Sequence, residues 1–329
     1  MAGVTADDIV ASIELILGRT PDQALIDHHL ALGFKNRFDL GWYMLSTQES
    51  RARTRALQRQ PLFLGDRLLA HTYRDEPIYL IPTDLDVTPS ILFHGRYEAH
   101  VERVIAGSIR PGDIAIDIGS NVGVHTLVIG RAVGPEGRVH AFEANAEVMK
   151  FLKPTLLLNG LTSWRGTGRV TLYPYAVTDR AGSLVLEQAP GHFGSGHLLT
   201  DSPGSDFGPE YSVRVEVPTI TIDGLLGGTI ERLDFLHMDI EGAEPMAVKG
   251  ARALISRSPT LRIVTEWSPE MMNSIGNARE LIDWLVGEGF RFWRVGGDAG
   301  VDPVPVAVAD LANHPHSDMF ISRQDPPAF

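Results

Sequence analysis

The segment DIAIDIGSNVGVHT, residues 113–126, constrains the fold more than any other part of the sequence. A short apolar run ends at Asp117, a glycine-rich turn follows it, and a helical pattern begins after the turn. Glycines let the backbone turn tightly and approach a ligand closely. The next helix offers its N-terminal N–H groups to an anionic part of that ligand. The pattern therefore predicts a strand, a ligand-binding turn and a helix, in that order.

Strand and helix patterns alternate over the chain after residue 61. Further strand-like runs lie in GRVHAFEAN, RVTLYPYAVTD, LDFLHMDIEGAE, TLRIVTEWSP, FRFWRVG and DMFIS, and PLFLGDRLLAHTY with PIYLIPT suggests a hairpin. This alternation predicts an α/β fold with a doubly wound, mostly parallel sheet. We expect an antiparallel strand near the C-terminus.

Residues 6–50 instead carry apolar side chains at helical spacing, with a break between helices at Gly18 and Pro21. The basic stretch RARTRALQRQ (51–60) is a linker or a solvated helix face. We therefore expect a helical N-terminal module over residues 1–58 and an α/β domain over residues 59–329.

Composition limits the possible partners. The 329 residues include no cysteine and carry a net charge of −12. The absence of cysteine excludes disulfides, thiolate metal sites and thiol nucleophiles. Without long basic runs, nucleic acid is not an expected partner. No apolar run is long enough to span a membrane, and the acidic N-terminus is unlike a signal peptide. We expect a cytoplasmic protein.

Two cofactor classes compete for the glycine-rich turn. A dinucleotide fingerprint G-x-G-x-x-G would need glycine at Asn121 and Val124, so it fails twice. The loop of class I S-adenosylmethionine methyltransferases instead asks for Asp117, Gly119 and Gly123, and all three are present. Asn121 replaces the middle glycine, and asparagine tolerates left-handed backbone angles.

Glu143 ends the second strand, about 20 residues after the turn, where nucleotide-binding folds place an acid. Its carboxylate can accept hydrogen bonds from both ribose hydroxyls; alternatively, it caps the helix that starts near Ala146. We also assign four neighbouring residues to the cofactor site: Ser120, Ala144, Asn145 and Ala176.

Three acids lie close together in HMDIEGAEP, residues 237–245. Asp239 ends a strand level with the glycine-rich turn, so we expect it to point into the cofactor cleft. Glu244 precedes a proline, which is favoured at the first position of a helix, so its simplest role is a helix-start charge. Glu241 either shapes the loop or contacts substrate.

The segments GRYEAHVERVIAGSIRPGDIAIDIGSNVGVHT, HAFEAN, LDFLHMDIEGAEPMAVKGA and RIVTEWSPEMM together resemble the FkbM family of S-adenosylmethionine-dependent methyltransferases. The resemblance covers residues 61–329. It implies an O-methyltransferase that acts on hydroxyls of sugars, glycolipids or polyketide-type rings. Glu98 falls where the family carries a Tyr-Glu pair and would close the cofactor pocket, or is a solvated helix residue. His237 stands where many members carry lysine.

An alcohol is a poor nucleophile, so a base or a metal should assist methyl transfer. The candidate catalytic residues are Asp239, Glu241, His237 and Glu266, and His237 is otherwise a satisfied core histidine. Hard oxygen ligands suit Mg²⁺. A divalent metal held by Asp239, Glu266 and Glu241 is an option that no tight ligand motif enforces.

Two further segments suggest functions. The Gly- and Ser-rich stretch 188–211, with His192 and His197, is either an active-site lid or disordered. LGRTPD followed by LSTQES resembles a small helical module with an L-G-R-x-P-D signature, found beside bacterial glycosyltransferases and methyltransferases. It implies a glycan or small-molecule acceptor, and protein contacts or self-association through these helices.

The sequence therefore favours an S-adenosylmethionine-dependent O-methyltransferase. The alternatives are a non-catalytic binding module on the same fold and, less favoured, an NAD-dependent oxidoreductase.

Overall fold

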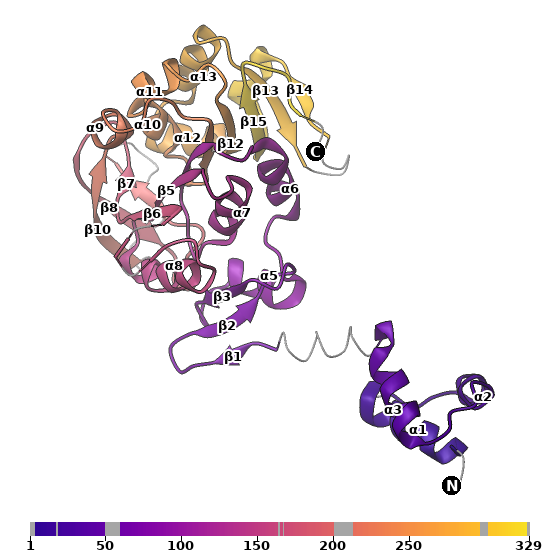
Figure 1. The fold of residues 1–329 in the computed structure, drawn as a ribbon. Coiled ribbons are helices and arrows are strands. Elements are labelled where there is room, and N and C mark those ends of the chain that lie inside the picture. Colours follow the sequence, from indigo (N-terminus) through magenta and orange to yellow (C-terminus); the bar gives the residue numbers. More distant parts are fainter. Residues whose placement is uncertain are drawn as a thin grey trace. The chain divides into compact units, whose positions relative to one another are not determined.

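The computed structural model describes residues 4–17, 19–49, 60–163, 165–166, 168–200, 213–296 and 302–327. The chain divides into two compact units, Met1–Pro61 and Leu62–Phe329 (Figure 1). Over the part of the chain so described, no helix combines the length and the apolar character needed to cross a membrane.

The described residues of the first unit form three helices, α1 (Ala6–Leu17), α2 (Gln23–Ala31) and α3 (Arg37–Ser46). Its small core includes Ile9, Ile13 and Leu40. The guanidinium of Arg19 donates to both oxygens of Glu49, at 2.5 and 2.9 Å, and so links LGRTPD to LSTQES. The predicted linker at 51–60 lies outside the described residues except for its last position.

The second unit is built on an eight-stranded sheet in the order β14-β13-β15-β12-β11-β4-β5-β6 (Figure 1). Its strands are β4 (Ile114–Ile118), β5 (Arg138–Phe142), β6 (Val170–Tyr173), β11 (Phe235–Met238), β12 (Arg262–Trp267), β13 (Arg291–Val295), β14 (Val304–Val306) and β15 (Ser317–Ser322). Strands β6, β5, β4, β11 and β12 are parallel, whereas β15 is antiparallel to β12 and β13. The predicted mostly parallel sheet with an antiparallel strand near the C-terminus is confirmed.

Apolar side chains on both faces of this sheet are buried, because successive strand residues point to opposite sides. Ala115 and Phe235 pack into one core, and Ile116 and Leu236 into another. The helices are α6 (Ala99–Ser108), α7 (Val124–Ala132), α8 (Ala146–Leu158), α9 (Ile222–Leu226), α10 (Glu244–Lys249), α11 (Arg252–Ser256), α12 (Pro269–Ile275), α13 (Ala278–Gly287) and the 3-10 helix η1 (Val308–Asn313). Ala247 of α10 and Leu281 of α13 pack into one core, and Leu127 of α7 and Leu152 of α8 pack into the other, so helices cover both faces and the sheet is doubly wound.

Two smaller sheets complete the unit. The first, β1 (Leu62–Phe63), β2 (Leu68–His71) and β3 (Pro77–Leu80), is the predicted hairpin extended by one short strand, and α5 (Val87–His94) follows it. The second, in the order β7-β10-β8-β9, is formed by β7 (Ala176–Val177), β8 (Gly182–Gln188), β9 (His197–Leu199) and β10 (Val213–Ile220).

Strands β8 and β10 were not predicted from the sequence. The expectation that 188–211 has no regular structure is wrong for His197–Leu199, because this segment pairs with β8. Tertiary pairing overrides the weak local strand preference of a Gly-rich stretch. Residues 201–212 lie outside the described residues.

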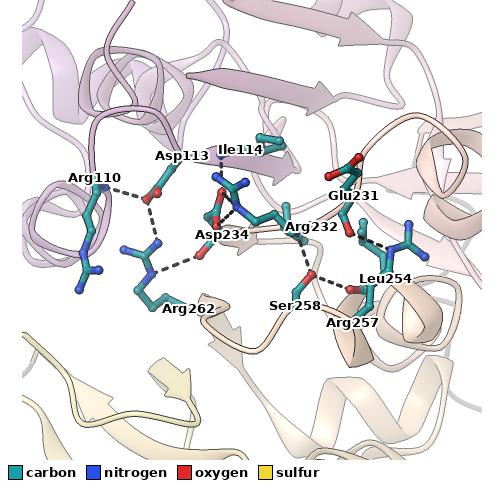
Figure 2. Close-up of polar contacts among 11 residues, drawn as sticks. Arg110, Asp113, Ile114, Glu231, Arg232, Asp234, Leu254, Arg257, Ser258 and Arg262 are labelled. Atoms are coloured by element: carbon teal, nitrogen blue, oxygen red, sulfur yellow. Dashed lines mark hydrogen bonds and ion pairs between the residues drawn. The ribbon is translucent and has the colours of Figure 1, made fainter. Parts of the chain in front are cut away.

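Acids at the amino ends of the parallel strands are paired with arginines (Figure 2). Asp113, just before β4, accepts from the Arg262 guanidinium at 2.8 Å and from the Arg110 N–H at 2.7 Å. Asp234, just before β11, accepts from the Ile114 N–H and from Arg232, both at 2.9 Å. These contacts join β4, β11 and β12 at one edge of the sheet.

Candidate active site

The glycine-rich turn leaves the carboxyl end of β4 and packs directly against the segment after β11. Gly119 has a φ of +85°, and a Cβ there would lie 2.0 Å from the carbonyl oxygen of Asp239. Asn121 has a φ of +46°, a left-handed backbone conformation that asparagine tolerates. Gly123 has a φ of +102°, and a Cβ there would lie 2.9 Å from Leu152. Glycine is required at 119 by both its backbone angle and its neighbour.

A pocket lies over this turn, and we call it the glycine-turn pocket. Of the predicted cofactor residues it is lined by Gly119, Ser120, Asn121, Glu143, Ala144, Asn145, Ala176 and Asp239. Apolar side chains that include Val87, Phe142 and Leu186 form much of its remaining wall. An apolar pocket with a few convergent polar groups is typical of a small-molecule site.

Glu143 presents its carboxylate to this pocket. One oxygen accepts from the Asn121 N–H at 2.9 Å and the other from the Asn145 N–H at 2.7 Å. Asn145, rather than Glu143, caps α8 through its side chain. Burial raises the pKa of Glu143 to about 7, although the two backbone hydrogen bonds oppose this rise. Each carboxylate oxygen keeps acceptor capacity, so the group fits a ribose diol.

Asp117 lies beneath the pocket and does not line it. One oxygen accepts from the His237 ring at 2.8 Å, and the other accepts from the hydroxyls of Ser120 and Thr126 at 3.0 and 2.5 Å. Burial opposes ionisation, but these hydrogen bonds keep the pKa of Asp117 below its usual value. Burial also opposes the charged form of His237, but Asp117 keeps the pKa of His237 raised. Asp117 therefore orients His237.

A second cavity, of about 230 Å³, adjoins the first, and we call it the acidic cavity. Its lining residues are Tyr97, Glu98, Val101, Ser195, His237, Asp239, Glu241, Val264, Thr265, Glu266, His316 and Asp318. Within the described ranges, no lysine or arginine lines it. Tyr97 and Asp239 line both the acidic cavity and the glycine-turn pocket.

The catalytic candidates meet in the acidic cavity. Burial, reinforced by repulsion from Asp239, raises the pKa of Glu241 to about 8 and that of Glu266 to about 10. Burial also raises the pKa of Asp239, but only to about 6, because the charge on His237 opposes the rise. Asp239 is therefore the most readily ionised of the three carboxyl groups.

Glu98 lies at the start of α6 with a φ of +48° and faces the acidic cavity, not the glycine-turn pocket. Burial and repulsion from Asp239 raise the pKa of Glu98 to about 9. Its carboxylate lies 3.7 Å from Nε2 of His125, and burial lowers the pKa of that histidine to about 3. His125 is therefore neutral and adds no positive charge beside Glu98.

Glu244 is the first residue of α10 and precedes Pro245, as predicted for a helix start. It is buried, however, and one of its oxygens accepts from the Ile240 N–H at 3.3 Å. Burial raises the pKa of Glu244 to about 8. It lines neither of the two cavities.

The segment between β8 and β9 forms part of the pocket wall through Phe193, Gly194 and Gly196. Asp86 fixes this segment by accepting from His192 at 2.8 Å and from the Gly194 N–H at 3.0 Å. His197 is instead buried, 3.5 Å from Glu187. Sequence reasoning missed Tyr97, Gln188 and Phe193 as lining residues; only the Tyr97-Glu98 pair carried a signal that could have identified one of them.

Comparison with known protein families identifies a match. Residues 117–292, more than half of the chain, match the family described as the methyltransferase FkbM domain. The search of curated proteins found no match.

Three solved structures are similar at low identity. Methyltransferase FkbM from Methylobacillus flagellatus KT is 13% identical, and the match covers 71% of this chain and 60% of that protein's chain, with a TM-score of 0.40. An S-adenosylmethionine-dependent O-methyltransferase from Thermotoga maritima is 16% identical, with coverages of 83% and 88% and a TM-score of 0.39. An O-methyltransferase from Bacillus cereus is 13% identical, with coverages of 72% and 86% and a TM-score of 0.40.

Structural similarity at 13–16% identity says nothing about the substrate. The family match includes the glycine-rich turn, Glu143, the D-x-E-G-A-E element and Glu266. The glycine-turn pocket offers the carboxyl groups of Glu143 and Asp239 to a ligand. The chain belongs to the FkbM family of S-adenosylmethionine-dependent methyltransferases.

Proposed function

We propose that the protein methylates a hydroxyl oxygen of a sugar, a glycan or a secondary metabolite. One observation carries the proposal: among the described residues, Asp239 is the one carboxylate that lines both the glycine-turn pocket and the acidic cavity. A methyl donor in the first and an acceptor in the second would meet beside this side chain. Holding two reactants in line supplies much of the rate of a displacement.

Glu143 would accept hydrogen bonds from the ribose hydroxyls, and the turn from Gly119 to Gly123 would bring backbone close to the rest of the donor. When bound, S-adenosylmethionine supplies a methyl group on a positively charged sulfur; the S–CH₃ bond breaks as the acceptor oxygen bonds to the carbon, leaving a neutral thioether. The segment carrying Phe193, held by Asp86, would limit access of water.

Asp239 is our candidate for the general base that takes the proton of the acceptor hydroxyl. A base works best when its pKa lies near the operating pH, and the pKa of Asp239 is raised by burial to about 6. The raised pKa of Glu98 would leave this group protonated at neutral pH and able to donate to an acceptor oxygen. His237, oriented by Asp117, would favour the ionised form of Asp239.

The lining of the acidic cavity favours an acceptor that is uncharged or positively charged where it enters. Five carboxyl groups line it, from Glu98, Asp239, Glu241, Glu266 and Asp318. A phosphate-rich acceptor would find no lysine or arginine among the described residues that line this cavity, whereas nucleic-acid sites present basic side chains. This supports a hydroxylated small molecule or glycan over a nucleic acid.

Calorimetry and a transfer assay test the proposal. We expect S-adenosylmethionine to bind to the full chain and NAD not to bind. Labelled donor incubated with small-molecule and glycan extracts should yield a product whose new methyl group, located by mass spectrometry, is on oxygen. Binding of NAD instead, or a methyl group on nitrogen or carbon, would contradict the proposal.

A further inference from the structure

Three carboxylates of the acidic cavity converge on one point. Asp239 and Glu241 come from the segment after β11, and Glu266 comes from β12. One oxygen from each lies within 4.8 Å of the other two. Oxygens that share one hard cation at about 2.0 to 2.6 Å can lie up to about 5 Å apart. The spacing therefore allows all three to reach a single ion.

Glu266 gives a second, independent indication. Its side chain is only 10% exposed and lines the cavity. Its Oε2 atom is fully buried and has no hydrogen-bond partner in the parts of the chain that the structure describes. An unsatisfied buried acceptor costs about 1 to 3 kcal/mol or more, and native proteins leave few of them. A cation among the three carboxylates would satisfy this oxygen.

Among the described residues, the neighbouring basic groups do not satisfy Oε2 of Glu266. Nε2 of His316 lies 3.4 Å from the other oxygen of Glu266, and the side chain of His316 is 65% exposed. His237 donates from Nδ1 to Asp117. The volume of about 230 Å³ is several times the volume of about 30 Å³ that one water occupies in the liquid. An ion that keeps part of its water shell therefore fits.

We propose that Asp239, Glu241 and Glu266 bind one divalent cation, Mg²⁺ or Mn²⁺, in the acidic cavity. Carboxylate oxygens are the ligands these hard ions prefer. One oxygen of each residue suffices, so Asp239 keeps its second oxygen for the proton of the acceptor. The charge of the ion would lower the pKa of a nearby hydroxyl. This role in methyl transfer rests on the proposed function, whereas binding of the ion does not.

The full chain is first treated with EDTA, and the chelator is then removed. Electron paramagnetic resonance of added Mn²⁺ measures how many ions the chain binds and how tightly. We expect one tight Mn²⁺ per chain, displaced by Mg²⁺. Glu266→Gln should weaken Mn²⁺ binding by at least about 10-fold, which even the loss of an outer-shell partner can cost. Glu270→Gln, an exposed acid on the following helix α12, is the control and should leave Mn²⁺ binding unchanged.

Calorimetric titration of the same samples with S-adenosylmethionine separates the two proposals. Absence of Mn²⁺ binding to wild-type protein that binds S-adenosylmethionine would overturn the ion site alone, as would Mn²⁺ binding unchanged in Glu266→Gln. Mn²⁺ binding without S-adenosylmethionine binding would leave the ion site standing and contradict the proposed function.

Discussion

Strand β11 has an aspartate next to each of its ends, and their surroundings differ. Asp234, before the strand, accepts hydrogen bonds from the Ile114 N–H and from Arg232, within the arginine-rich network of Figure 2. Asp239, after the strand, lines a cavity in which no described lysine or arginine lies. Asp234 has an arginine partner, whereas the basic groups near Asp239 are the imidazoles of His237 and His316. A carboxyl group whose pKa is raised and that lines a cavity suggests a function.

The same contrast extends to the neighbouring strands. At the amino edge, Arg262 of β12 donates to Asp113 beside β4. At the carboxyl edge, Glu266 of β12 has a buried oxygen without a partner among the described residues. Ligands of open α/β sheets bind at the carboxyl ends of the strands. The contacts at the amino ends of the strands therefore stabilise the sheet, whereas the residues at the carboxyl ends line the candidate active site.

The largest expected effect is on turnover. Asp239→Asn removes the proposed base while keeping its shape, so methyl transfer from labelled donor should fall by about 1000-fold, within the range for general acid–base groups. Binding of S-adenosylmethionine should remain measurable. Turnover close to the wild-type value would remove Asp239 from the catalytic role.

At the amino ends of the strands, we expect that removing an arginine lowers the free energy of unfolding. Arg262→Met leaves Asp113 without its guanidinium partner, and breaking a buried pair in this way costs about 3 kcal/mol or more. Urea unfolding followed by circular dichroism measures the change. Turnover per folded molecule should stay near the wild-type value; a selective loss of turnover would show that the amino edge also serves catalysis.

Affinity for the methyl donor should depend on Glu143. Glu143→Gln should weaken binding of S-adenosylmethionine by about 10- to 100-fold, since a hydrogen bond to a charged group contributes about 1.5 to 3 kcal/mol. Glu147→Gln, an exposed acid in the first turn of α8, is the matched control. Equal affinities of the two variants in calorimetry would contradict the ribose role.

The smallest expected effect is on the pH dependence of that affinity. Burial raises the pKa of Glu143 to about 7, so protonation below that value removes acceptor capacity from the ribose site. Affinity for S-adenosylmethionine should therefore fall by up to about 10-fold from pH 8 to pH 6, the expected change in the ionised fraction. The part of this pH dependence that is due to Glu143 should be missing in Glu143→Gln. If the affinity of this variant showed the same pH profile as the wild type, the titrating group would be another residue.

Local sequence patterns predicted the framework of the site. The apolar run before Asp117, the glycines and the start of α10 at Glu244 depend on backbone angles and nearest neighbours, and the structure confirms them. Roles that depend on distant partners could not be predicted in this way. Asp117 and His237 are 120 residues apart and become register neighbours only when β4 pairs with β11.

Strand β8 was missed because its burial pattern does not alternate, so no period-2 pattern marks it. Strand β10 does alternate between apolar and charged side chains over Val213–Val217, a signal that the prediction overlooked. Both strands are held by pairing with each other and with β7 and β9. The contributions of Gln188 and Phe193 to the glycine-turn pocket depend on that sheet. The helical module, the site assignments and the acceptor class remain predictions.

The unfolding free energies of Asp234→Asn and Asp239→Asn, measured side by side in urea with EDTA present, test the central claim most directly. We expect Asp234→Asn to lose about 1 to 3 kcal/mol of unfolding free energy, because the substitution weakens charge-assisted hydrogen bonds. Asp239→Asn should be as stable as the wild type or more stable. A loss of stability in Asp239→Asn equal to that in Asp234→Asn would contradict the account, because both acids would then serve the fold.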